Sequence, residues 1–342
     1  MSGSAREARP LSLAEALDAL RAPDATERWS TLVGERVLVV DLGGSPPAGA
    51  AADARAHEAL ASLPCPSVAF GPAELAPGIL PFARRCDVHV ATRAELVPVF
   101  AGIDAAPLAA TALVQCLRAS EGMDVESGLV LESLTYSTLQ GGPEFAAWRA
   151  ARPGPRVRPP PKGAAVRAAR EGELLRITLA RPEKRNAFSA EMRDGLVEAL
   201  RVAVCAPEIR QIRLEGEGPS FCSGGDLDEF GELPDPATAH VVRTTRSAAR
   251  LLAACADRVH AEVHGACVGA GVELPAFAAR VVARADARFW LPELDLGLIP
   301  GAGGTVSLPR RIGRQRTAWL ALSRRPIDAD TARRWGLVDA LC

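Results

Sequence analysis

Lysine is nearly absent from this chain of 342 residues, because Lys162 and Lys184 are the only two. Arginine carries almost all of the positive charge, and the net charge is only −1. Nucleic-acid-binding proteins usually have a basic balance, so no nucleic-acid partner is expected. We attribute the abundance of arginine and alanine to codon bias in a GC-rich genome rather than to a functional arginine patch.

Cysteine pairs at the spacing of zinc or redox sites are also missing. The eight cysteines are scattered and none forms a C-x-x-C pair, which argues against a zinc site or a disulfide scaffold. No apolar stretch is long and uncharged enough to span a bilayer, and residues 1–10 lack the apolar run of a signal peptide. We therefore expect a soluble cytoplasmic protein without a membrane partner.

A proline-rich segment at 152–162, RPGPRVRPPPK, is the clearest domain boundary. Its five prolines and one glycine cannot sustain a helix or an inner strand, and such a segment favours an extended linker. The chain is therefore expected to consist of an N-terminal domain (1–151), a linker (152–170) and a C-terminal domain (171–342).

The N-terminal domain is predicted to be a small α/β unit that ends in a helical hairpin. Short apolar runs bounded by breakers indicate strands, and longer amphipathic stretches indicate helices. We expect strands at 36–42, 67–70 and 87–91, and helices at 11–20, 107–118, 125–140 and 144–151.

In the C-terminal domain, expected strands and helices alternate, which predicts a mixed α/β layer fold. We expect strands at 173–179, 208–215 and 259–263, and helices at 190–204, 238–256 and 272–279.

Three segments of the C-terminal domain combine glycine loops with carboxylates: 220–230 (SFCSGGDLDEF), 264–274 (HGACVGAGVEL) and 289–305 (FWLPELDLGLIPGAGGT). The glycines let backbone N–H groups point into a cleft, where two of them can hold a thioester oxygen as it becomes negative. A carboxylate in apolar surroundings has a raised pKa and exchanges protons near neutral pH. A second carboxylate can orient a water molecule.

Each of these features also has a plain structural interpretation. A glycine-rich turn is usually only a turn. Glu273 could be a first-turn residue that stabilises a helix dipole, and Glu293 could be an exposed loop acid. Asp226 and Asp228 are more typical of helix caps than of catalysts. The order and spacing of the features favour the chemical interpretation.

The ordered motifs resemble those of the crotonase superfamily, the enoyl-CoA hydratase/isomerase family. The family patterns are roughly R-P-x-K-x-N-A, F-x-A-G-x-D-L, N-G-x-x-x-G-G-G-x-E-L and F-x-x-P-E-x-x-x-G-x-x-P-G-x-G-G-T. They are matched here at 181–187, 221–227, 264–274 and 289–305, with a further match at 332–338. The resemblance covers about residues 173–342 and implies a crotonase-like ββα spiral core there.

Carried over by position, the resemblance implies an oxyanion hole made by the N–H groups of Gly225 and Ala270. Ala270 replaces the family's glycine but still offers its N–H. The resemblance also implies an acid/base pair, Glu273 and Glu293, at the 20-residue separation typical of hydratases. The implied coenzyme A (CoA) contacts are Lys184, Arg185, Ala187, Ser223, Asp226 and Leu227.

The activity implied by the resemblance is hydration of a 2-enoyl-CoA thioester. Double-bond isomerisation, thioester hydrolysis and carbon–carbon cleavage within the same superfamily stay open, as does a non-catalytic crotonase-like subunit. The resemblance implies an acyl-CoA substrate, a homo-oligomer (trimer or hexamer) and no metal or redox cofactor.

Family members normally continue past the last motif with a helical tail, whereas this sequence stops at Cys342. Segment 107–150 is similar to such a tail and includes the acidic residue Glu132. One hypothesis is that the first half is a degenerate crotonase-like unit whose helices cover the active site. The alternative is an unrelated α/β cap with a helical hairpin.

Overall fold

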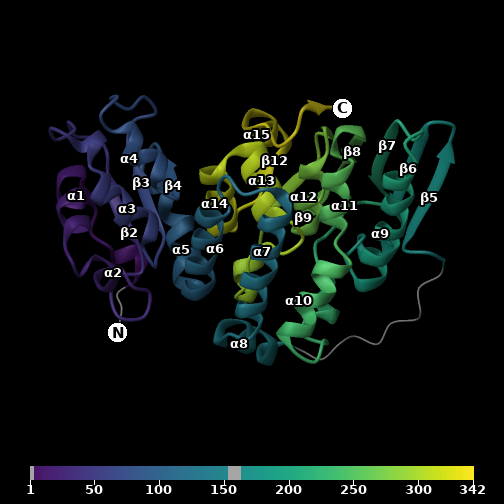
Figure 1. Ribbon diagram of the computed structural model, residues 1–342, viewed down its shortest axis with the longest axis horizontal. Helices are drawn as coiled ribbons and strands as arrows, with labels where there is room; N and C mark the ends of the chain where they lie inside the picture. The colour runs from purple at the N-terminus through teal and green to yellow at the C-terminus, as the bar shows by residue number, and fades with distance from the viewer. Residues whose placement is uncertain (1–3, 153–162) are drawn as a thin grey trace.

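The computed structural model describes residues 4–152 and 163–342, which form a mixed α/β protein with three sheets (Figure 1). The α/β class expected from the sequence is confirmed. Of the expected linker, residues 153–162 lie outside the described residues.

The N-terminal sheet is parallel throughout, in the order β1-β2-β3-β4. Side chains alternate across a strand, so Leu38 and Val40 of β2 pack in one hydrophobic core and Val37 and Val39 belong to another. Helices α1, α3 and α4 fill the first of these cores. The bounds are β1 (Leu11–Ser12), β2 (Leu38–Asp41), β3 (Ser67–Phe70), β4 (Val88–Val90), α1 (Leu13–Arg21), α2 (Ala25–Arg28), α3 (Ala54–Ser62) and α4 (Leu80–Arg85).

Four helices follow the N-terminal sheet; in Figure 1, α5 and α6 lie next to that sheet, and α7 and α8 pack against the C-terminal half. They are α5 (Val97–Ala105), α6 (Pro107–Ala119), α7 (Val125–Gln140) and α8 (Pro143–Ala151). One continuous core joins them to the second face of the N-terminal sheet and to the C-terminal half. Among the described residues no single helix is long and apolar enough to cross a membrane, although a pair bent by 112°, Arg93–Ala105 with Pro107–Ala119, passes on length and composition alone.

The largest sheet has six strands in the order β13-β10-β8-β7-β6-β5, and only β5 is antiparallel to its neighbour. The expected linker extended to residue 170, but β5 already begins at Val166, so that boundary is wrong. Five of the six β5 residues are exposed, which left no apolar alternation to detect. The bounds are β5 (Val166–Glu171), β6 (Leu174–Leu179), β7 (Gln211–Gly216), β8 (Val259–Val263), β10 (Arg280–Ala283) and β13 (Ala340–Leu341).

The third sheet is small, in the order β12-β11-β9, and two of its strands lead directly into the glycine loops. The helix expected at 238–256 is two helices, because Ser247 accepts a hydrogen bond from the N–H of Arg250 and caps a new start. The helix expected at 272–279 ends early, at Glu273, and Pro275 follows. The bounds are β9 (Ala266–Val268), β11 (Arg288–Trp290), β12 (Ile327–Asp328), α9 (Ala190–Cys205), α10 (Pro236–Thr245), α11 (Ala248–Ala254), α12 (Ala270–Glu273), α13 (Gly304–Ile312), α14 (Arg314–Ser323) and α15 (Ala329–Trp335).

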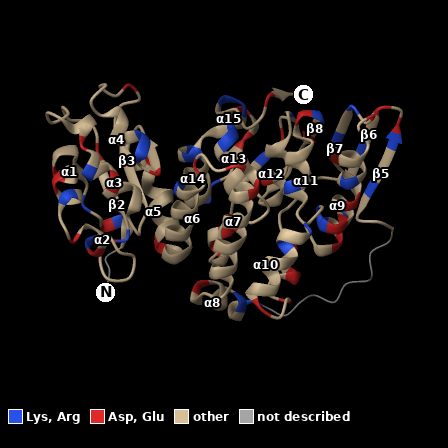
Figure 2. Cartoon of the chain, in the orientation of Figure 1, with Lys and Arg blue, Asp and Glu red and all other residues tan. Residues whose placement is uncertain are grey.

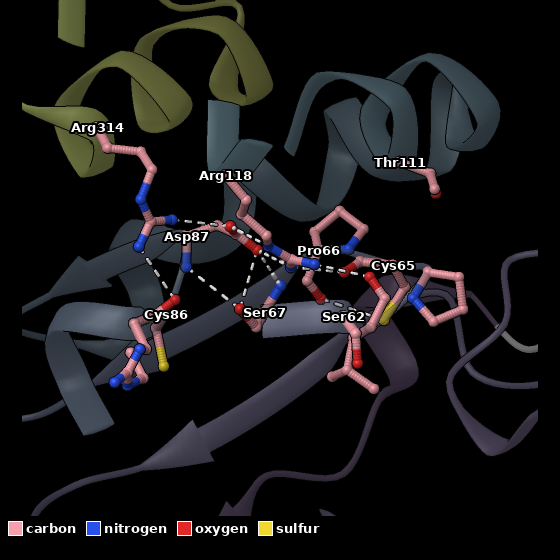
Figure 3. A network of polar contacts seen from close by, with 12 residues as sticks. Ser62, Cys65, Pro66, Ser67, Cys86, Asp87, Thr111, Arg118 and Arg314 are labelled. Atoms are coloured by element: carbon pink, nitrogen blue, oxygen red, sulfur yellow. Dashed lines mark hydrogen bonds and ion pairs between the residues drawn. The ribbon is translucent and has the colours of Figure 1, made fainter. Parts of the chain in front are cut away.

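A buried ion-pair network attaches the N-terminal sheet to the rest of the molecule (Figure 3). Asp87, at the start of β4, is 1% exposed and accepts hydrogen bonds from Arg118 Nε of α6 (2.9 Å) and a terminal nitrogen of Arg314 of α14 (3.0 Å). The N–H and the hydroxyl of Ser67 also bind this carboxylate. Since a buried charge requires partners, this arrangement fixes the sheet against both helices.

Charged side chains of both signs are interspersed over the helices and strands (Figure 2). Within residues 4–152 the strands form a single sheet, β1-β2-β3-β4. The small third sheet, β12-β11-β9, therefore has no counterpart among these residues. The hypothesis that the first half descends from a crotonase-like unit stays a prediction.

Candidate active site

Glu273 is the last residue of the short helix α12 and is 2% exposed. Its Oε2 accepts hydrogen bonds from the backbone N–H groups of Ala302 (2.7 Å) and Gly304 (2.9 Å). Burial, together with the negative charges of Glu293 and Glu132, raises the pKa of Glu273 well above its ordinary value. The carboxylate is thus fixed in place, and its raised pKa makes it a stronger proton acceptor than an exposed glutamate.

Glu293 begins the short 3₁₀ helix Glu293–Leu296, three residues after Trp290, the last residue of β11. Its Oε2 is buried and has no hydrogen-bond partner within the described part of the chain. Burial raises the pKa of Glu293 to about 8. Glu293 is therefore not the exposed loop acid of the plain interpretation.

Gly269 brings the two carboxylates together. A Cβ atom at this position would lie 2.5 Å from Glu293 Oε1 and 3.8 Å from Glu273 Oε1, so the two oxygens are at most about 6 Å apart. The residue has φ 49° and ψ −117°, a conformation that favours glycine. Both Oε1 atoms thus face the space beside one glycine.

The two loops expected to form the oxyanion hole run side by side. Cys222 pairs in parallel with Cys267, and Gly225 and Ala270 each follow three residues later. In the described residues neither of these two N–H groups donates a hydrogen bond. Ala270 begins α12 with a negative φ, so its methyl group requires no special backbone conformation. The structure therefore leaves both predicted donors free.

The predicted CoA contacts lie on two adjacent loops, 184–187 and 223–227. Lys184 Nζ and Asp226 Oδ2 form an ion pair of 2.6 Å, and the N–H of Ser223 donates to the carbonyl of Arg185. Leu227 is exposed. The two loops are thus brought together, while Lys184 and Asp226 already bind each other.

Asn186 was part of a recognised motif but received no role from the sequence. It is fully buried, and its Nδ2 donates to the carbonyls of Glu217 (2.8 Å) and Ser220 (3.0 Å), while its Oδ1 accepts from the N–H of Arg181. Its φ of 53° lies in the left-handed region, which asparagine tolerates well. Asn186 fixes the loop at 181–187 against the segment that leads to the oxyanion loop.

Glu132 of α7 also reaches the site, although the sequence suggested only that it was the acid of a tail-like helix. It is 3% exposed and accepts hydrogen bonds from the backbone N–H groups of Gly303 (2.7 Å) and Thr305 (2.9 Å) and from the Thr305 hydroxyl (2.7 Å). Burial raises the pKa of Glu132 to about 7. A lone acid among apolar and hydroxyl residues was its only sequence signal.

A cavity of about 60 Å³ adjoins this loop. Its lining includes Glu132, Arg243, Leu274 and the backbone at 301–303. A larger hollow of about 470 Å³ lies on the N-terminal domain, around Trp29 and Val37, away from the carboxylates. The smaller cavity adjoins the carboxylate loop of the candidate site.

The α/β fold, the paired buried carboxylates and the two free N–H groups are what an acid/base enzyme acting on thioesters requires. Residues 169–342, half of the chain, match the family model for enoyl-CoA hydratase/isomerase. The chain belongs to this family, and the resemblance to the crotonase superfamily is confirmed.

Two relatives from Escherichia coli K12 are equally similar to this chain. The 1,2-epoxyphenylacetyl-CoA isomerase is 37% identical over 173 residues, covering 49% of this chain and 66% of the relative. The 2,3-dehydroadipyl-CoA hydratase is 37% identical over 169 residues, with the same coverage. The chain thus spans slightly less than two thirds of these relatives, and identity does not separate isomerase from hydratase.

A solved structure from Thermobifida fusca YX, titled as an enoyl-CoA hydratase in complex with CoA, is 31% identical. The match covers 52% of this chain and 72% of that one, with a TM-score of 0.48.

Proposed function

We propose that this chain adds water across the double bond of a 2-enoyl-CoA thioester. The observation that carries the proposal is the pair of carboxylates Glu273 and Glu293, whose Oε1 atoms face the same space beside Gly269. Glu273 is buried, and Glu293 is half-buried with a buried Oε2. A water molecule held between two carboxylates can be deprotonated by one while the other protonates the substrate.

In the proposed reaction the water oxygen bonds to the β-carbon and its proton passes to Glu273. The electrons of the double bond form an enolate, and the N–H groups of Gly225 and Ala270 stabilise the oxygen that becomes negative. Glu293 gives its proton to the α-carbon. The proton on Glu273 then passes to Glu293, which restores the starting state of the pair. Two N–H bonds to Glu273 Oε2 favour negative charge on that residue rather than on Glu293.

We also infer that α7 and α8 cover the site. A Cβ atom at Gly301 would lie 2.4 Å from the ring of Tyr136 of α7, so helix and loop are in close contact. Trp148 of α8 packs edge-on against Phe230 (6.0 Å between ring centroids), and Phe230 in turn packs against Gly225. The first half thereby packs against the loop at 301–305, which binds Glu273, and against Phe230, which contacts the proposed oxyanion donor Gly225.

Isomerisation of a double bond is the second candidate, since it needs one glutamate to move a proton between two carbons. A relative from Mycosarcoma maydis named as an enoyl-CoA isomerase/hydratase, 33% identical over 175 residues, favours it. The presence of two facing carboxylates favours hydration.

The test is the loss of enoyl absorbance with crotonyl-CoA and with longer and aromatic 2-enoyl-CoAs. We expect Glu273→Gln and Glu293→Gln each to lower kcat at least 100-fold while folding normally, and Glu198→Gln, an exposed glutamate on α9, to retain activity. If wild type consumes none of these thioesters, the hydratase proposal is wrong. If it isomerises 3-enoyl-CoAs and needs only one glutamate, the second candidate replaces it.

A further inference from the structure

Four consecutive backbone N–H groups at the start of α13 are divided between two carboxylates from different halves of the chain. Glu273 binds those of Ala302 and Gly304, and Glu132 binds those of Gly303 and Thr305. The first N–H groups of a helix have no partner within the helix, so they require acceptors of this kind. Neither carboxylate can move without disturbing the backbone that holds the other.

Charged and titratable groups surround Glu132 on every element packed against it. Thr305 of α13 donates its hydroxyl to Glu132 and accepts the Cys116 thiol of α6 at 3.8 Å. Arg243 of α10 attracts the carboxylate, and Tyr136 lies on the same helix α7. The charge of Glu132 raises the pKa values of Glu273 and Glu293, the two glutamates of the candidate site. Arg193, Arg246 and Arg250 line the cavity that Glu132 also lines.

We propose that Glu132 is a positioning residue for the Glu273–Glu293 pair, acting both through the shared backbone at 302–305 and through its negative charge. The expected effect on kcat rests on the proposed hydratase function, whereas the expected effect on the protonation of the two glutamates does not. It assigns to the first half a part in acid/base chemistry, although the family match begins only at residue 169.

Replacing Glu132 by glutamine changes both the backbone contacts and the charge. A glutamine at this position offers one acceptor oxygen, so its NH₂ group would face the N–H of either Gly303 or Thr305. The turn must then shift, and the two N–H groups that fix Glu273 shift with it. The same change removes a negative charge beside Glu273 and Glu293, which makes both of them easier to ionise.

The experiment compares wild type, Glu132→Gln and Glu126→Gln. Glu126 is a matched control because it lies on the same helix and also binds the C-terminal half, through an exposed ion pair with Arg250. For each protein we would measure kcat, KM and the pH profile with crotonyl-CoA. The infrared band of protonated carboxyls, with isotope-labelled glutamate, would be followed against pH in the unliganded protein.

We expect Glu132→Gln to lower kcat at least tenfold with KM changed less than threefold. Both the pH profile and the titration of the infrared band should move to lower pH, while Glu126→Gln resembles wild type. If Glu132→Gln lowers only the melting temperature and leaves kcat and both titrations unchanged, Glu132 is merely structural and the proposal is overturned.

The infrared titration also separates this proposal from the proposed function. If wild type hydrates no enoyl-CoA, the hydratase proposal fails, yet a shifted band in Glu132→Gln still supports the coupling and an unshifted band overturns it. Should Glu132→Gln fail to fold, Thr305→Val removes the hydroxyl bond to Glu132 and the weak contact with the Cys116 thiol, while both backbone bonds to Glu132 stay. It is expected to lower kcat several-fold, and an unchanged kcat and band would contradict the proposal.

Discussion

Replacing Gly269 by alanine tests the facing of the two carboxylates most directly. The new methyl group would lie 2.5 Å from Glu293 Oε1, which must retreat by about 1 Å to reach ordinary van der Waals contact. The backbone conformation adds strain of about 1–3 kcal/mol for a residue with a Cβ, and overpacking adds a similar amount. We therefore expect a loss of roughly 2–6 kcal/mol in the free energy of unfolding.

The same displacement should be more costly for catalysis than for folding, because a misplacement of about 1 Å can lower a rate 100-fold. Gly172→Ala is the matched control, since Gly172 also has a positive φ (63°) but would place its Cβ in open space. The assays are hydration of crotonyl-CoA and urea unfolding. If Gly269→Ala is as active as Gly172→Ala, the two carboxylates do not act together at this glycine.

Two further predictions concern stability. The pKa of Glu293 rises from 4.5 to about 8 on folding, so the folded protein keeps a proton that the unfolded chain releases, and stability should fall as pH rises from about 4.5 to 8. Each such carboxyl changes the free energy of unfolding by up to about 1.4 kcal/mol per pH unit. In urea unfolding between pH 5 and 8, the free energy of unfolding should therefore depend less steeply on pH in Glu293→Gln than in wild type. An equal dependence would contradict the raised pKa of Glu293. Asp87→Ala leaves the guanidinium groups of Arg118 and Arg314 without their buried carboxylate and should cost about 3–5 kcal/mol in the same assay; a loss below about 1 kcal/mol would show that the network in Figure 3 does not stabilise the fold.

Much of the fold could be predicted because local patterns were strong. The strands at 67–70 and 259–263 and the helix at 125–140 have the bounds that the sequence indicated. β5 was missed because an exposed edge strand owes its structure to pairing with β6 rather than to its own side chains. The break near Ser247 was missed because an amphipathic pattern continues across a capping residue.

The sequence could indicate those residues of the candidate site that lie within local motifs. It could not indicate a residue that reaches the site only through packing between segments distant in sequence. Glu273, Glu293, Gly225 and Ala270 lie in ordered motifs, so the sequence could indicate them. Glu132 lies 141 positions before Glu273 and reaches the site only through the packing of α7 on α13. No local pattern reports a hydrogen bond that depends on such packing.

The alternating hydrogen bonds at 302–305 also bear on how this protein can be divided. Sequence similarity begins at residue 169, yet Gly303 and Thr305 take their hydrogen-bond acceptor from α7, and one core runs through both halves. A fragment cut at the similarity boundary would expose that core and leave these N–H groups without their acceptor. The unit of inheritance and the unit of cooperative folding therefore differ in this chain, and only the second includes the helices of the first half.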